Sequence, residues 1–238
     1  MRPDRRNENC LRDIKIEMSW SPHAEGSCLI SFGKTKVLCT ASVDEHLPRW
    51  LRGQRQGWLT AEYAMLPRAT QERTHREVSR GKVSGRTSEI QRLIGRSLRA
   101  CIDLRKLGER QILIDCDVLQ ADGGTRTAAI TGAWLALNQA CNALVDRTII
   151  TDNPIHSQIA AVSVGLLQGR AHLDLCYEED RMAQTDANFV LTARSEIVEV
   201  QATAETLPMK HEQFEAMFHL ARAGIVELCK HQKQAIAS

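Results

Sequence analysis

The chain of 238 residues is 43% hydrophobic, so it can bury a substantial core as one large domain or as two fused halves. Its net charge of +2 excludes a basic tail protein, although a local basic cluster remains compatible with nucleic-acid binding. The N-terminus is charged and no stretch approaches about 18 uninterrupted apolar residues, which predicts neither a classical export signal nor a membrane-spanning segment.

Eight cysteines are spread along the chain without a C-x-x-C pair, and several lie inside apolar runs. This pattern suits reduced, packed thiols rather than a zinc site or a disulfide frame. The cysteine usage therefore predicts a reducing, cytoplasmic environment.

The first predicted elements are two β-strands, at residues 27–32 and 36–43. The intervening Gly33-Lys34-Thr35 has a length and composition typical of a hairpin. The fold is therefore expected to open with antiparallel strands.

An arginine-rich segment follows at residues 49–86, with nine basic and three acidic side chains, an excess of six positive charges. Residues 68–85 show no sustained apolar period, which predicts a long exposed loop. The arginines fit either a solvated face or an RNA path in which they pair with phosphates while Trp58 and Tyr63 stack on bases.

Apolar residues spaced by threes and fours from Ile90 to Leu107 predict an amphipathic helix that Gly108 ends. Arg86 should project from the start of this helix, because the candidate N-cap residues lie around it. These candidates are Ser84, Thr87 and Ser88.

The stretch LQADGGTRT at residues 119–127 joins a predicted strand, 111–119, to a predicted helix, 128–146, that is apolar nearly all round. Its glycines permit a sharp turn, and the first turn of a helix offers unpaired N–H donors. Arg126 adds a guanidinium fork, so a phosphate site is one interpretation and a simple glycine turn is the other. Asp115 and Asp117 are interpreted as polar residues on the solvent face of the strand rather than as site residues.

The second half repeats the order of hairpin, further strand and helix after a turn at residues 151–154. The predicted strands are 159–167, 171–176, 187–192 and 195–204, and the predicted helix is 210–235. The repeated order suggests a duplicated β/α unit. Between the strands, Asp180 and Asp186 fit either an ordinary acidic loop or oxygen ligands for Mg²⁺.

Several motifs resemble those of the bacterial ribonuclease PH family, in the same order along the chain. They are WLTAEY at 58–63, MLPR at 65–68, GRT at 85–87 with EIQRLI at 89–94, DCDVLQADGGTRT at 115–127 and EVQ at 199–201. The resemblance implies an α+β fold: one ribonuclease PH domain over residues 1–238, built from two similar β/α halves of about 1–150 and 151–238, with mixed sheets packed against helices.

The resemblance also implies an activity and an assembly. Family members are phosphorolytic 3′-to-5′ exoribonucleases, or transfer RNA nucleotidyltransferases, which trim precursor tRNA, and in some cases ribosomal RNA, with inorganic phosphate. They release nucleoside diphosphates reversibly and form homohexamers that are trimers of dimers. The alternative within the same fold is a non-catalytic RNA-binding ring subunit.

Carried over residue by residue, the resemblance assigns three groups of side chains. The phosphate would be bound by Arg86, Gly124, Thr125 and Arg126. The divalent metal, Mg²⁺, would be held by Asp180 and Asp186, and the RNA route would be lined by Arg68, Arg73 and Arg76.

The chain departs from the family pattern where members usually carry glycine. These positions are Arg5, Arg55 and Ala202, together with a turn at residues 193–195. If the backbone there has a positive φ, each replacement is expected to cost on the order of 1 kcal/mol.

Overall fold

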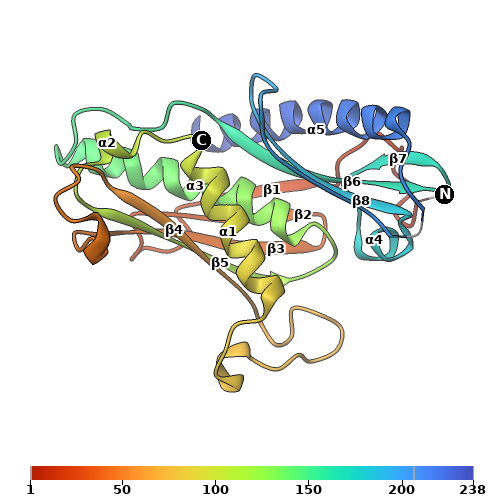
Figure 1. Cartoon of the computed structure of the whole chain (residues 1–238), viewed down its shortest axis with the longest axis horizontal. Helices are drawn as coiled ribbons and strands as arrows, with labels where there is room; N and C mark the ends of the chain where they lie inside the picture. The colour runs from red at the N-terminus through yellow and green to blue at the C-terminus, as the bar shows by residue number, and fades with distance from the viewer. Residues whose placement is uncertain (1, 206, 238) are drawn as a thin grey trace.

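The computed structural model describes residues 2–205 and 207–237, and its helices pack around two β-sheets (Figure 1). The first sheet has the strand order β1-β2-β3-β5-β4, with only β4 and β5 parallel. Its strands are β1 (Ile14–Met18), β2 (Gly26–Phe32), β3 (Thr35–Asp44), β4 (Trp58–Met65) and β5 (Gln111–Gln120).

The second sheet is antiparallel throughout, with the order β7-β6-β8-β9. Its strands are β6 (Ile159–Leu167), β7 (Arg170–Leu173), β8 (Thr185–Thr192) and β9 (Ile197–Ala204). The predicted α+β architecture with mixed sheets and helices is confirmed. That the two halves superpose as a duplicated unit stays a prediction.

Five α-helices and two short 3₁₀ helices connect and cover the sheets in the described residues. They are η1 (Arg49–Leu51), η2 (Glu77–Arg80), α1 (Gly85–Arg99), α2 (Leu104–Leu107), α3 (Thr125–Asp146), α4 (Tyr177–Met182) and α5 (His211–Ala237). Helix α1 packs on β4, and α5 packs on β6, β7 and β1, so it joins the two sheets.

Helix α3 is the centre of the core, as its apolar sequence predicts. It packs against β2 and β3 of the first sheet and against β6 of the second. At Gly26 the approach is so close that a Cβ atom would lie 2.0 Å from the carbonyl oxygen of Ala136. Buried residues from both sheets and all three long helices form one continuous hydrophobic cluster, so the two halves share a core.

The predicted helix from Ile90 to Leu107 is wrong in its extent. Helix α1 ends at Arg99, and Ile102 then forms an isolated β-bridge with Ile155. The Asp103 side chain caps the separate short helix α2. The apolar spacing in the sequence does not reveal this break, because Leu107 of α2 is buried as well.

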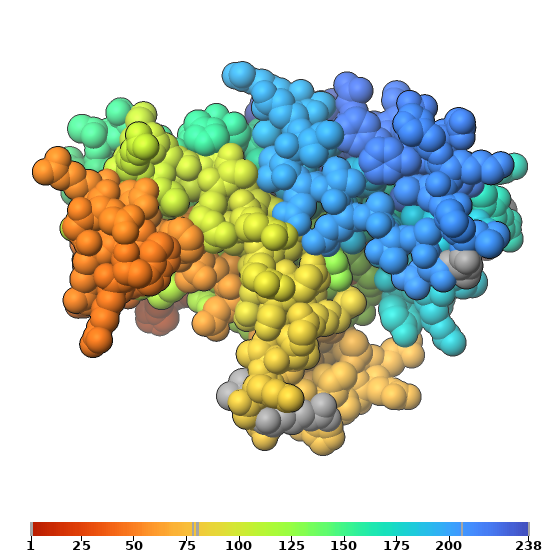
Figure 2. Space-filling model, viewed as in Figure 1, coloured from red at the N-terminus to blue at the C-terminus, as the bar shows by residue number. Residues whose placement is uncertain are grey.

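Two other boundaries differ from the predictions. The predicted strand 171–176 is shorter, because β7 ends before Asp174, whose φ of 54° leaves the extended region. The acidic segment after it forms the short helix α4. By contrast, the predicted loop at 68–85 is confirmed apart from η2 and the first residue of α1, and it projects from the body of the molecule (Figure 2).

All eight cysteines are free thiols, and seven of them are buried, as predicted for packed residues. Burial raises the pKa values of Cys28, Cys101 and Cys141 to about 12, so these thiols stay protonated near neutral pH. Among the described residues, no helix combines the length and apolarity needed to cross a membrane.

Positive φ angles occur at most of the positions where the family pattern has glycine. Arg5 has φ 62°, Arg55 has φ 54°, and Ser195 in the third turn has φ 67°. Ala202 differs, because it is paired with Ala187 inside β9 and needs no glycine. The expected strain is therefore present at three positions and absent at the fourth.

We expect Arg55→Gly to raise the free energy of unfolding by about 0.5–1 kcal/mol. The left-handed conformation costs an L-residue roughly 1–2 kcal/mol, and the added freedom of the unfolded glycine chain offsets part of this gain. Denaturant unfolding of the two proteins measures the difference.

The matched control is Arg52→Gly, because Arg52 is also exposed but has a φ of −59°. It should lose roughly 0.5–1 kcal/mol. An equal loss in both variants would contradict a strained Arg55.

Candidate active site

A cavity of about 210 Å³ lies where the starts of α1 and α3 meet α4 and β8. All six residues predicted to bind phosphate or metal line it, although they come from both halves of the sequence. They are Arg86, Gly124, Thr125, Arg126, Asp180 and Asp186. A larger cavity of about 1080 Å³, on the other side of α4, contains none of them.

The glycine turn has a geometry that only glycine satisfies. Gly123 and Gly124 have φ values of 73° and 65°. A Cβ atom on Gly123 would lie 2.6 Å from the Leu175 carbonyl oxygen. The Thr35 hydroxyl donates to the Gly123 carbonyl at 2.7 Å and accepts from the Asp122 N–H at 2.9 Å, which fixes the orientation of the turn.

Helix α3 starts directly after this turn, with Gly124 as its N-cap residue. The first N–H groups of a helix have no partner within the helix, and they carry a partial positive charge, so this end of α3 favours an anion. The Thr125 hydroxyl accepts a 2.9 Å hydrogen bond from Tyr63.

The alternative in which Tyr63 stacks on bases does not fit the structure, because its side chain is only 4% exposed and its hydroxyl is used by Thr125. Trp58 lies at the opposite end of β4 from the cavity residue Met65, about 23 Å away at the usual rise of a strand. Its ring packs against Trp50 and under the Arg99 guanidinium, whose carbon is 4.8 Å from the ring centroid.

Arg126 belongs to a polar network that joins three elements. Its Nη1 donates to Gln201 at 3.1 Å and lies 3.5 Å from a Glu89 carboxylate oxygen. Gln201 donates in turn to Glu89 at 3.0 Å, so β9 and α1 both hold the arginine. Sequence reasoning assigned no role to Glu89 or Gln201, although both lie in the motifs that carry the family resemblance.

Arg86 lies in the first turn of α1, as predicted. The Ser84 hydroxyl caps this helix by accepting from the Thr87 N–H at 3.2 Å. The Thr87 hydroxyl donates to Glu77 at 2.9 Å, which ties the helix start to the arginine-rich loop. Arg86 itself is exposed at the cavity.

Asp180 and Asp186 both line the cavity, and their carboxylates repel each other. Asp180 keeps an accessible surface, but the surrounding protein still desolvates it and thereby raises its pKa, and repulsion from Asp186 raises the pKa further. The positive charges of Arg86 and Arg126 offset part of this increase. The site therefore places two arginine guanidinium groups beside two carboxylates that repel each other.

The two carboxylates fit Mg²⁺, which proteins usually bind through one or two carboxylates together with waters and substrate phosphate oxygens. A divalent cation would also relieve the repulsion between them. Within residues 2–205 and 207–237, no group of three or more His, Cys, Asp or Glu side chains forms a complete metal cage.

The predicted RNA-binding residues Arg68, Arg73 and Arg76 are exposed on the loop that follows β4, and none of them lines the cavity. The start of this loop is anchored to the glycine motif, because the Ala69 carbonyl accepts from the Ala121 N–H at 2.8 Å. The next residue, Thr70, lines the cavity.

Asp115 and Asp117 lie outside the cavity lining, which agrees with their interpretation as sheet-face residues. Partial burial raises both pKa values, and the neighbouring Glu62 contributes to the increase. Arg76 opposes the increase at Asp117, so the arginine-rich loop lies close to this face.

Two family models match the chain. The 3′ exoribonuclease family, domain 1, matches residues 10–141, and domain 2 of the same family matches residues 157–224. Ribonuclease PH of Maricaulis maris is 60% identical over 236 residues, which cover 99% of each chain. Ribonuclease PH of Methylobacterium radiotolerans is 61% identical over 237 residues, which cover 100% of each chain.

Solved structures with the same fold include the Archaeoglobus fulgidus exosome with RNA bound to the active site, with a TM-score of 0.81 and 20% identity over 97% of this chain and 92% of that chain. Rice Rrp46 matches with a TM-score of 0.77 and 18% identity over 98% of each chain. These likenesses establish the fold, and the sequence matches establish the family. The chain therefore belongs to the ribonuclease PH family of phosphorolytic 3′ exoribonucleases.

Proposed function

We propose that the 210 Å³ cavity is the site where this chain, a tRNA nucleotidyltransferase, removes nucleotides from the 3′ ends of tRNA precursors. One observation carries the assignment: two arginines, a helix N-terminus and two carboxylates, from both halves of the chain, converge on one cavity. These are the groups that phosphoryl transfer requires for positioning and for charge stabilisation.

Inorganic phosphate is the attacking group in this proposal. Arg86, Arg126 and the first N–H groups of α3 hold it and reduce its repulsion with the RNA backbone. A phosphate oxygen forms a bond to the terminal phosphorus, and the bond to the preceding 3′ oxygen breaks. The products are a nucleoside diphosphate and an RNA that is one nucleotide shorter, with a free 3′ hydroxyl.

Asp180 and Asp186 hold the divalent cation. When bound, Mg²⁺ neutralises charge on the transferring phosphoryl group and on the departing 3′ oxygen. Neither carboxylate is assigned the proton transfer, because metal ligation competes with that role.

The RNA approaches along the arginine-rich loop, with Arg68, Arg73 and Arg76 contacting its phosphates. Phosphate contacts at a single-stranded 3′ end imply weak sequence preference. The proposed assembly is a homohexameric ring, a trimer of dimers, as the family resemblance implies. Free thiols at all eight cysteines support a cytoplasmic location.

Incubation of the pure protein with a 3′-extended tRNA, with and without phosphate and Mg²⁺, tests the reaction. Nucleoside diphosphates should form only when phosphate is present. Nucleoside monophosphates formed without phosphate would mean hydrolysis, and RNA binding without any product would favour the alternative of a non-catalytic ring subunit.

We expect Arg126→Ala to lower kcat/KM for phosphate by about 100-fold or more, the usual effect of removing one charge-stabilising donor. The folded structure should persist, because Arg126 and its partners Glu89 and Gln201 are partly exposed rather than buried in the core. Arg222→Ala, an exposed arginine on α5, is the control and should retain full turnover. Undiminished turnover in Arg126→Ala would remove this arginine from the site.

We expect Asp180→Asn to match or exceed the metal-free melting temperature of the unaltered protein. Desolvation and Asp186 raise the Asp180 pKa, so ionised Asp180 disfavours the folded state at neutral pH, and neutralising it removes that penalty. The same variant should lose most of the rise in melting temperature that Mg²⁺ produces, and most of the turnover.

The matched control for this substitution is Glu178→Gln, an exposed acid on the same helix α4. It should keep the Mg²⁺-dependent rise in melting temperature. If Asp180→Asn keeps that rise in full, Asp180 is not a ligand.

A further inference from the structure

A buried ion pair lies beneath the cavity, between Arg12 and Asp174. The side chains are 4% and 0% exposed, respectively. Arg12 Nε and Nη2 donate to the two Asp174 carboxylate oxygens at 3.0 and 2.7 Å, and the Arg12 backbone N–H donates to one of them at 2.8 Å. The arginine is therefore fixed in one orientation by three hydrogen bonds.

The remaining donors of Arg12 reach the glycine turn. Its Nη1 donates to the Asp122 carbonyl at 2.5 Å, and its Nη2 donates to the Gly123 carbonyl at 3.4 Å. The guanidinium also packs against Gly124, where a Cβ atom would lie 2.9 Å from Nη2. In a trans peptide the N–H points away from the preceding carbonyl, so the Gly123 and Gly124 N–H groups point away from Arg12. Both glycines line the cavity.

Asp174 is itself held in a mildly strained conformation, since Asp tolerates the left-handed region better than most L-residues. Its φ of 54° is in the left-handed region, and its N–H donates to the Ser163 carbonyl at 2.7 Å. Ser163 lines the cavity. Strain of this kind persists only where the surroundings determine the conformation, as three arginines do here.

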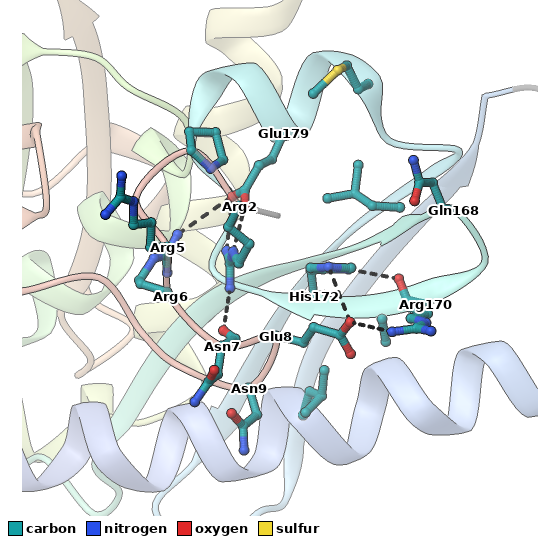
Figure 3. Close-up of a pocket in the computed structure, with 15 residues that line it drawn as sticks. Arg2, Arg5, Arg6, Asn7, Glu8, Asn9, Gln168, Arg170, His172 and Glu179 are labelled. Carbon is teal, nitrogen blue, oxygen red and sulfur yellow. Dashed lines mark hydrogen bonds and ion pairs between the residues drawn. The ribbon is translucent and has the colours of Figure 1, made fainter.

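Two of these arginines connect Asp174 to α4. Arg2 and Arg6 both donate to the Asp174 carbonyl, at 3.1 and 3.0 Å. Arg2 also forms a two-pronged pair with the buried Glu179, at 2.6 and 2.9 Å, and Arg6 lies 3.6 Å from the same carboxylate. Figure 3 shows Arg2 and Arg6 both directed at Glu179.

Glu179 immediately precedes Asp180 on a helix of six residues, which is too short to be stable alone. The position of the Asp180 carboxylate therefore depends on what holds Glu179. A direct link closes the network, because Asp122 Oδ1 accepts from the Tyr177 N–H at the start of α4, at 3.3 Å. Phosphate turn and metal-binding helix are thus joined through one buried polar network.

We propose that Arg12 and Asp174 are positioning residues that set the glycine turn against α4. Neither residue lines the cavity, so they act through Asp122, Gly123 and Gly124 rather than on substrate. The inference rests on the proposed phosphate site. Its physical basis is that a buried ion pair adds little net stability, because desolvation offsets the attraction, whereas the planar fork of Arg12 fixes several partners in one geometry.

The test is Arg12→Lys, which keeps the charge but loses the fork. The expected result is an increase in KM for phosphate of roughly tenfold, the lower end of the range for residues that support a site from behind. The KM for tRNA should change less than about twofold, because α1 and the arginine-rich loop are untouched. Phosphate binding without RNA, measured by titration calorimetry, should weaken by the same factor.

The second variant is Asp174→Asn, since asparagine has the same size and tolerates a positive φ. It should raise KM for phosphate in the same way. Arg170→Lys is the matched control, because the ion pair between Arg170 and Glu8 is exposed. The KM of this variant for phosphate should not change.

The outcomes separate this inference from the proposed function. If Arg126→Ala abolishes phosphate binding but Arg12→Lys and Asp174→Asn bind it normally, the positioning role is wrong and the phosphate site stands. If Arg126→Ala binds phosphate normally, the site itself is wrong. Failure of both Arg12→Lys and Asp174→Asn to fold, or a fall in kcat with no change in KM for phosphate, would mean a general structural role and would also overturn the proposal.

Discussion

Helix α3 is covered on almost every side, by β2 and β3 of one sheet and by β6 of the other. A long helix buried in this way cannot shift along its axis without disturbing the packing of both sheets. Its N-terminus is therefore fixed relative to the rest of the core, and the N–H groups that follow Gly124 have a constant place and direction. The anion-binding role proposed for this end of the cavity depends on this constraint, because a preorganised donor needs no rearrangement when charge develops.

The site also requires both halves of the chain at once. Arg86 and Arg126 start helices of the first half, whereas Asp180 and Asp186 come from α4 and β8 of the second. Positive and negative groups lie within one small cavity, so each partly neutralises the field of the other. Such a site suits a reaction in which an anion attacks an anion, because neither reactant faces a field of one sign only.

What the sequence predicts well is local in origin. The Gly123-Gly124 turn, the start of α1 and the buried helix α3 follow from neighbouring residues and are confirmed, and of the three N-cap candidates Ser84 is the cap. The helix predicted up to Leu107 failed because a tertiary β-bridge at Ile102 interrupts it, which no local periodicity reveals. The stacking alternative for Tyr63 failed for a related reason, since nearness to arginines in the sequence does not say which face of the strand is covered.

Long-range polar networks are the part that sequence reasoning misses. Arg12 and Asp174 are 162 positions apart, and neither belongs to a spaced motif. Their meaning appears only when burial and backbone strain are compared. Arg55 is strained and exposed, and among the described residues only one hydrogen bond is recorded for it, from its N–H to the Glu109 carboxylate. Asp174 is less strained at the same φ, because Asp tolerates the left-handed region better, and it is fully buried, with its carboxylate and carbonyl bound by three arginines. Strain that is compensated by a buried network next to a cavity indicates function, whereas strain in an exposed turn indicates only tolerance.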